Sequence, residues 1–198
     1  MKNLLFILTI FLFFINSSAQ TGDSLTEQNG VVDTFKVLYP TKMQSKVDKI
    51  VTTLLSRYHY KKIDIDDSLS SVIFDNYIKT LDYNRMYFLK SDIDRFEKYR
   101  YSLDEYLKEG ILYPPFEIFN TFKNRLTERT VYVVERLGIQ FDYSKDENFV
   151  PDRENTEWAK NNKDLDDLWR MRLKNDALNK KLAKEEWEKT SKRRGWLW

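Results

Sequence analysis

Apolar residues return every three or four positions in five stretches of this chain, and the first stretch lies between residues 41 and 58. Such spacing places the apolar side chains on one face of a helix. Thr41 with Gln44 suits a capping box at the start of this helix, and Ser45 offers a competing start. The apolar positions of this predicted helix are Val47, Ile50, Val51, Leu54, Leu55 and Tyr58.

Two further helices are predicted before residue 110. The first runs from about Ser68 to Asp82, and either Asp66 or Asp67 can cap it. Its expected buried face holds Leu69, Val72, Ile73, Tyr77 and Leu81. The second starts at Ser91, with Asp94 three residues later, and ends where Gly110 suits a left-handed cap. Its expected inward residues are Ile93, Phe96, Leu103 and Leu107.

The second half of the chain predicts two more helices and a long connection. Pro114 and Pro115 suit a first helical turn, and Gly138 would end that helix. Its apolar pattern is Ile118, Phe119, Phe122, Leu126, Val133, Val134 and Leu137. Residues 139–158 read as an extended excursion over the surface, and a last helix begins near Asn162. That helix uses Leu165, Leu168, Trp169, Arg172 and Leu173. Without repeats or strand–helix alternation, the predicted class is all-α with about five helices.

Two ordered blocks of residues carry a family resemblance. The first is Phe74-Asp75, Tyr77, Leu81-Asp82-Tyr83, Phe88-Leu89, Asp92-Ile93 and Phe96. The second is Trp158, Leu165, Leu168-Trp169, Arg172, Lys174 and Asp176. Together they make residues 47–182 resemble the N-terminal domain of the tail-specific, or carboxy-terminal processing, proteases. From the residues alone, Tyr83, Tyr87 and Phe88 read as core packing at a helix corner, with a ligand site as the alternative.

The resemblance implies a serine endopeptidase with a lysine base that acts on C-terminal tails of exported or envelope proteins. The family's PDZ and serine/lysine segments would follow, and neither is present in these 198 residues. The expected function is therefore an N-terminal domain or fragment of such a protease, without activity alone. Its expected partners are polypeptide substrates or the missing PDZ and protease domains. The alternative is a free-standing exported helical protein that binds peptides or acts as a scaffold.

The first residues predict export to the periplasm or cell envelope. Lys2 precedes an apolar run from Leu4 to Ile15, broken only by Thr9, and the small residues Ser17-Ser18-Ala19 follow. This order is typical of a secretory signal peptide. The run is shorter than the about 20 residues that span a bilayer, so a retained anchor is the weaker interpretation. No later stretch is apolar enough for a transmembrane helix.

Four segments follow from these patterns. They are a signal peptide at 1–19, a flexible polar lead-in at 20–40, a helical domain at 41–190 and an atypical terminus at 191–198. The terminus combines Lys192-Arg193-Arg194 with Trp196 and Trp198. This pattern indicates a terminus produced by a truncated or frame-shifted reading frame. The alternative is a patch that binds a membrane surface or nucleic acid. Its tryptophans, with Trp187, predict self-association through the C-terminus.

Charge and composition exclude several classes of partner and chemistry. The net charge is +2, which gives no electrostatic argument for nucleic acid or anionic membrane, and there is no cysteine for a disulfide framework. The five glycines are too far apart for a P-loop, a dinucleotide fingerprint or a nucleophile elbow. With one histidine and no cysteine, a zinc site of the usual type cannot be built.

The remaining candidates favour structural roles. His59 lies at a helix end, where packing or the helix dipole explains it better than catalysis. Asp64, Asp66, Ser68 and Asp75 fit part of a calcium-loop frame, but Leu69 replaces its glycine and its glutamate is missing. Asp164, Asp166 and Asp167 suit a first helical turn. The spacing nominates no serine–lysine pair. We therefore predict no catalytic, cofactor-binding or metal-binding residues and no cofactor.

Overall fold

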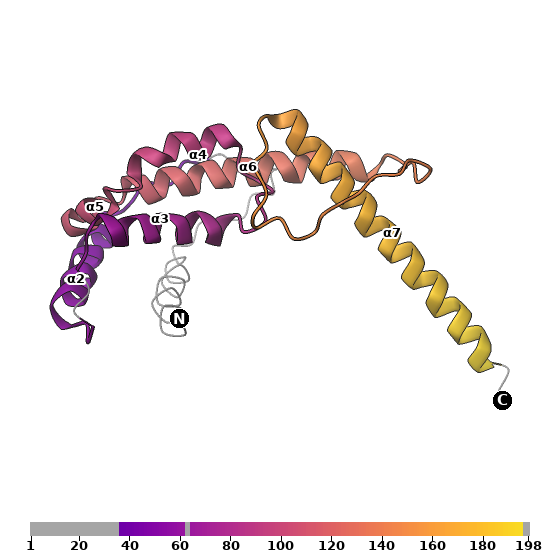
Figure 1. Ribbon diagram of the computed structural model, residues 1–198, viewed down its shortest axis with the longest axis horizontal. Helices are drawn as coiled ribbons and strands as arrows, with labels where there is room; N and C mark the ends of the chain where they lie inside the picture. The colour runs from indigo at the N-terminus through magenta and orange to yellow at the C-terminus, as the bar shows by residue number, and fades with distance from the viewer. Residues whose placement is uncertain (1–35, 62–63, 196–198) are drawn as a thin grey trace, which may run out of the picture. The chain divides into compact units, whose positions relative to one another are not determined.

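The computed structural model describes residues 36–61 and 64–195, with side chains to residue 189, and this part of the chain is helical (Figure 1). Its helices are α2 (Lys42–Tyr58), α3 (Asp67–Leu81), α4 (Lys90–Phe96), the 3-10 helix η2 (Glu97–Tyr99), α5 (Leu103–Glu109), α6 (Tyr113–Leu137) and α7 (Asn162–Gly195). No strand occurs in it, and Leu89 and Ala159 form a single parallel β-bridge. The all-α prediction is confirmed. The predicted signal peptide and most of the lead-in lie outside the described residues.

Local signals set most helix ends. Thr41 and Gln44 form the predicted capping box, since the Gln44 N–H donates to Thr41 Oγ1 at 3.2 Å and the Thr41 N–H donates to Gln44 Oε1 at 2.8 Å. Asp66 caps α3 by accepting from the Leu69 N–H at 2.9 Å. The two prolines lie in the first turn of α6, and Gly138 follows its last residue. These predictions are confirmed because each depends on neighbouring residues only.

The helix predicted from Ser91 to Gly110 is wrong, because the chain forms α4, η2 and α5 instead. Ser70 explains the break between the last two. Its hydroxyl donates to the Arg100 carbonyl at 2.8 Å and accepts from the Leu103 N–H at 2.8 Å. These contacts satisfy backbone groups that a continuous helix would pair internally. The predicted start at Ser91 is also wrong, since α4 begins at Lys90 and Asp92 accepts from the Leu89 N–H at 3.1 Å.

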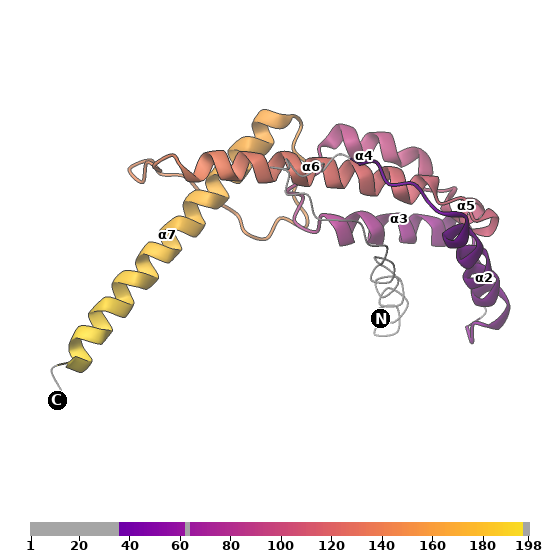
Figure 2. The ribbon, with the colours of Figure 1, turned by 180° about the vertical axis from the view of Figure 1, so that it is seen from behind.

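One buried cluster joins α3, α4 and α6, which run side by side in both views (Figures 1 and 2). Its members are Phe74, Ile78, Phe88, Phe96, Tyr99, Leu103 and Ile118. Phe96 and Leu103 lie inward as predicted. On α3 the fully buried residues are Ser70, Phe74 and Ile78, and the predicted Ile73, Tyr77 and Leu81 are partly buried and pack against the cluster. Val72, expected inside, is 47% exposed.

A second cluster joins the start of α7 to the chain before α4. It contains Met86, Leu89, Leu165, Leu168 and Trp169, so the predicted apolar face of the last helix is confirmed at its first turns. The predicted face of α6 holds at Ile118, which is buried, and at Phe122 and Val133, which pack against the two clusters. It does not hold at Leu126, Val134 and Leu137, which are exposed. Arg129 is buried on α6 instead and pairs with Asp166.

Helix α2 presents its apolar stripe to solvent rather than to the core. Ile50, Leu54 and Tyr58 are 53%, 51% and 76% exposed. Thr52 is its buried residue, and α2 lies against α5, where Gly110 comes close to the Ser45 carbonyl. The apolar spacing on α2 therefore does not mark the side that packs on this domain.

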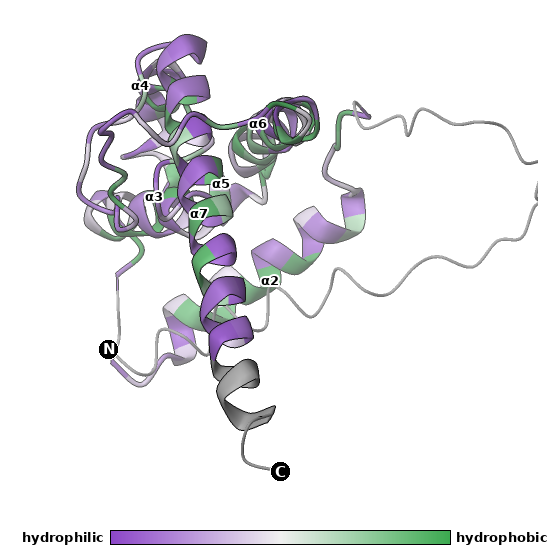
Figure 3. Ribbon diagram, turned by 90° about the vertical axis from the view of Figure 1, so that its right-hand side faces the viewer, coloured by the Kyte–Doolittle hydropathy of each residue, from purple (hydrophilic) through white to green (hydrophobic). Residues whose placement is uncertain are grey.

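The excursion from residue 139 to 161 has no helix, as predicted for 139–158, and ends at α7. The later turns of α7 are exposed and mainly hydrophilic (Figure 3). No helix in residues 36–61 and 64–195 is long and apolar enough to cross a membrane.

Candidate functional site

Asp82, directly after α3, organises the turn that follows it. Its carboxylate is buried and accepts from the Met86, Tyr87 and Phe88 N–H groups at 2.7, 2.8 and 2.9 Å. Burial raises the pKa of Asp82, while the three N–H donors favour its ionised form. The same turn contains Arg85, which has a left-handed backbone with φ of 51°. One buried carboxylate thus holds the backbone of three residues in a non-helical path.

The second sequence block docks on this turn. The Trp169 indole N–H donates to the Met86 carbonyl at 2.6 Å, and the Lys90 N–H donates to the Ala159 carbonyl at 2.8 Å. The rings of Phe88 and Trp158 have centroids 6.2 Å apart with edge geometry. We call residues 82–89 and 158–169 together the aromatic junction. The two blocks that carry the family resemblance are therefore in contact.

Tyr83, Tyr87 and Phe88 do not share one environment in the junction. Phe88 is fully buried, and Tyr87 packs on Trp169 with ring centroids 5.5 Å apart. Core packing is the role of these two residues. Tyr83 is 48% exposed and donates to Glu154 at 2.5 Å, so the prediction of core packing is wrong for it.

Ion pairs lie beside the junction and join neighbouring helices. Arg125 donates to both Asp92 carboxylate oxygens, at 2.8 and 3.2 Å. Buried Arg129 pairs with Asp166, whose backbone carbonyl accepts from the Tyr132 hydroxyl at 2.8 Å. Because these carboxylates bind neighbouring cations, the arrangement fixes helices rather than presenting free acid or base groups.

Two carboxylates of the excursion pair with cations on helices. Glu154 pairs with Lys79, which lies on α3. Glu147 pairs with Arg170 at 2.7 Å and with Lys174 at 2.7 Å, and these hydrogen bonds lower the pKa of Glu147 to about 2. Both carboxylates therefore tie the excursion to helices.

The acidic candidates lie apart and have separate partners. Asp66 caps α3, and Asp75 pairs with Arg100 at 2.8 Å. In the last helix, the Asp164 N–H donates to the Asn161 side chain at 3.0 Å, and Asp167 pairs with Arg170 at 3.0 Å. No group of three or more metal-ligating side chains is found among the described residues.

His59 follows the last residue of α2 and stays close to the backbone there. Its Nδ1 atom accepts from the Lys61 N–H at 3.3 Å. Within the described part of the chain, no serine hydroxyl is hydrogen-bonded to a lysine amine, and none of the candidate residues forms a nucleophile–base pair. That no residue is catalytic stays a prediction.

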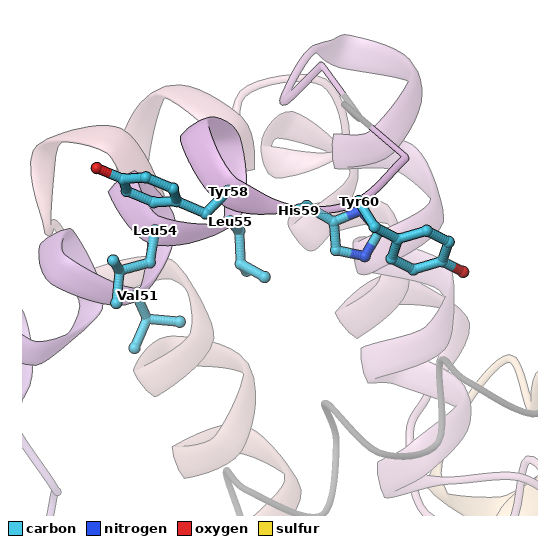
Figure 4. Close-up of a pocket in the computed structure, with 6 residues that line it drawn as sticks. All are labelled: Val51, Leu54, Leu55, Tyr58, His59 and Tyr60. Atoms are coloured by element: carbon cyan, nitrogen blue, oxygen red, sulfur yellow. The ribbon is translucent and has the colours of Figure 1, made fainter.

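A groove at the end of α2 is the feature that the motif search missed. It has a volume of about 450 Å³ and is lined by Val51, Leu54, Leu55, Tyr58, His59 and Tyr60 (Figure 4). The sequence did hold a signal for it, since these residues extend the apolar stripe of α2 past its end. Nothing in their chemistry indicates catalysis, because the lining is almost wholly apolar.

Comparison with known proteins supports the resemblance of both blocks. Residues 50–195 match the family described as "Tail specific protease N-terminal domain". The chain is similar to a "Tail-specific protease" from Haemophilus influenzae, with 40% identity over 140 residues. That alignment covers 70% of this chain and 20% of the relative, so the chain spans about a fifth of the relative's length.

Proposed function

The chain belongs to the tail-specific protease N-terminal domain family, and we propose that it serves as the helical N-terminal part of an exported serine endopeptidase. The observation that carries this proposal is the 40% identity to the Haemophilus influenzae protease, which extends across 140 residues. The match of residues 50–195 includes both blocks of the aromatic junction. The free-standing scaffold is the less favoured alternative.

The proposed role of this domain is support rather than bond cleavage. Several of its buried charged groups have partners within the domain, as Asp92 has in Arg125. Catalysis of acyl transfer needs a nucleophile, a base and oxyanion donors placed together. We place those groups in the rest of the protease, together with the site that takes polypeptide C-termini. The junction would keep the helices in one fixed arrangement for the other domains to pack on.

A domain exchange tests the role directly. Residues 50–195 replace the matching region of the Haemophilus influenzae protease, and cleavage of an unstructured polypeptide with an apolar C-terminus is measured. We expect the chimera to retain cleavage. The matched control carries Asp82→Ala, which removes the acceptor of three buried N–H groups and should unfold the exchanged domain. A folded chimera that cuts nothing would contradict the proposal.

The chain alone is expected to hydrolyse no such polypeptide. Turnover that survives repeated purification would contradict this expectation, since it would place catalytic groups within these 198 residues.

Export has its own measurement. Mass spectrometry of the chain from the periplasmic fraction should find Gln20 as its first residue, as the signal-peptide pattern predicts. A chain that retains Met1 and stays in the cytosolic fraction would contradict export.

A further inference from the structure

Helix α2 carries an apolar face that this domain leaves uncovered. The term apolar face refers below to six residues of α2. They are Met43, Val47, Ile50, Val51, Leu54 and Tyr58, and their exposed fractions lie between 36% and 76%. Tyr60, 69% exposed, follows the same line past the helix end. The face is continuous along the helix, since its members are three, four or one residue apart.

A basic edge runs beside this apolar face. It consists of Lys42, Lys46, Lys49 and Arg57, which are spaced to follow one side of the helix. None of these four cations makes an ion pair within the described part of the chain. The acidic residue of α2 is Asp48, which is half-buried. The exposed part of α2 is therefore cationic as well as apolar.

We propose that α2 docks this domain on an anionic lipid surface, with its apolar face in the interface and its basic edge toward lipid headgroups. A helix with one apolar side and lysines beside it is the form that lies in the plane of a membrane surface. Lysine stems can cover apolar surface while their amines reach the phosphates. Tyr58 and Tyr60 suit the same boundary, since each has an apolar ring and a polar hydroxyl.

Other occupants fit this face less well. A second copy of α2 would bring two basic edges together, and like charges repel. A protein partner is disfavoured by the three lysines of the edge, because lysine is depleted at protein interfaces whereas arginine is enriched. Charge complementarity thus favours the lipid. This inference goes beyond the proposed protease function and does not depend on it.

The test measures sedimentation of the full chain with vesicles. Vesicles of phosphatidylcholine alone are compared with vesicles that also contain phosphatidylglycerol, at low and high salt. We expect binding to the anionic vesicles only, weakened by salt through screening. All proteins must have the same N-terminus, confirmed by mass spectrometry, because the apolar run of residues 4–15 could bind vesicles itself.

Two pairs of variants locate the binding surface. Ile50→Asn with Leu54→Asn, at half-exposed positions, should weaken binding roughly tenfold or more through lost apolar contact. Lys42→Gln with Lys46→Gln should weaken it roughly tenfold or more through lost attraction to anionic lipid. The matched controls are Val134→Asn, which is 67% exposed on α6, and Lys160→Gln with Lys163→Gln. They should bind as the parent chain does.

Three results would overturn the proposal. The first is no binding to either kind of vesicle. The second is loss of binding when residues 190–198 are deleted but not in the α2 variants, which would move the lipid site to the C-terminus. The third is a dimer in light scattering that the Ile50→Asn and Leu54→Asn pair abolishes, which would make the apolar face a protein interface. Circular dichroism of each variant shows whether it keeps its helices.

Discussion

Asp82 and Ser70 each hold a bend of the chain by bonding backbone groups that no helix pairs there. Asp82 accepts from three N–H groups, and Ser70 joins the Arg100 carbonyl to the Leu103 N–H. Leaving such a buried group unpaired costs about 1–3 kcal/mol. At the scale of single residues, buried polar side chains therefore fix where helices stop, while apolar ones hold the pieces together.

Asp48 gives a prediction about pH. One of its carboxylate oxygens is buried and accepts no hydrogen bond within the described part of the chain. Burial raises the pKa of Asp48 from 3.8 to about 6. Between these values the folded state binds more protons than the unfolded state, so this group lowers stability as pH rises through that range. Asp48→Asn should therefore raise the free energy of unfolding at neutral pH.

The expected gain is about 1 kcal/mol, because solvent screening of a half-exposed group reduces the full effect of the pKa shift. Urea unfolding followed by circular dichroism at several pH values measures it. The difference from the parent chain should disappear below the ordinary pKa of aspartate. Asp146→Asn, at an exposed position, is the control and should change nothing. A less stable Asp48→Asn at neutral pH would mean that the ionised carboxylate makes a favourable contact.

At the scale of elements, Gly110 controls how α5 ends and how α2 lies on it. Its φ is 69°, and a Cβ atom there would lie 2.6 Å from the Ser45 carbonyl oxygen of α2. Gly110→Ala should therefore cost about 2 kcal/mol or more, from backbone strain and from the clash with a backbone atom. Thermal and urea unfolding measure this loss.

Gly138 supplies the matched control, because it also follows a helix but has a φ of −77°. A Cβ atom there would have the Glu135 carbonyl oxygen at 3.7 Å, which is ordinary contact. Gly138→Ala should change stability by less than about 0.5 kcal/mol. Equal effects of the two substitutions would show that the approach of α2 to α5 does not constrain Gly110.

The contrast between these glycines also shows what sequence could and could not predict. The ends of α5 at Gly110 and of α6 at Gly138 were predicted, as were the caps at Thr41 and Asp66. Each depends on residues within one turn of the helix. The break between η2 and α5 was not predicted, since Ser70 bonds the backbone there from thirty or more positions away. Such a contact leaves no local pattern.

Burial was predicted less well than helix position for the same reason. Periodicity identifies an apolar face but not the element that covers it, and the face of α2 is left uncovered by this domain. The groove at its end was missed because the search looked for reactive groups. The two blocks of the aromatic junction were recognised by resemblance, and their contact through Trp169 and Met86 could be seen only in the structure.

At the scale of the whole molecule, charge is balanced in total but not in place. The net charge of +2 gave no reason to expect an anionic partner. Carboxylates such as Glu147 hold the excursion through ion pairs. The lysines and the arginine of the basic edge on α2, by contrast, form no ion pair within the described part of the chain. A surface can thus attract anionic lipid while the sum over the chain is small.

The C-terminal end of the molecule gives the last prediction. Leu178, Leu182 and Trp187 of α7 are 36%, 52% and 67% exposed, and the side chains from residue 190 onward lie outside the described part. Exposed apolar surface promotes association, and the sequence after the described part contains Trp196 and Trp198. We expect the chain to self-associate and to become a monomer when residues 190–198 are deleted.

Light scattering and thermal unfolding on both proteins measure this effect. The melting temperature should change by less than about 2 °C, because the buried clusters end near Trp169, well before the deletion. The Ile50→Asn and Leu54→Asn pair is the control and should leave self-association intact, since it alters the other exposed apolar face. A full-length monomer whose melting temperature falls sharply on deletion would mean instead that the terminus packs as part of the native fold.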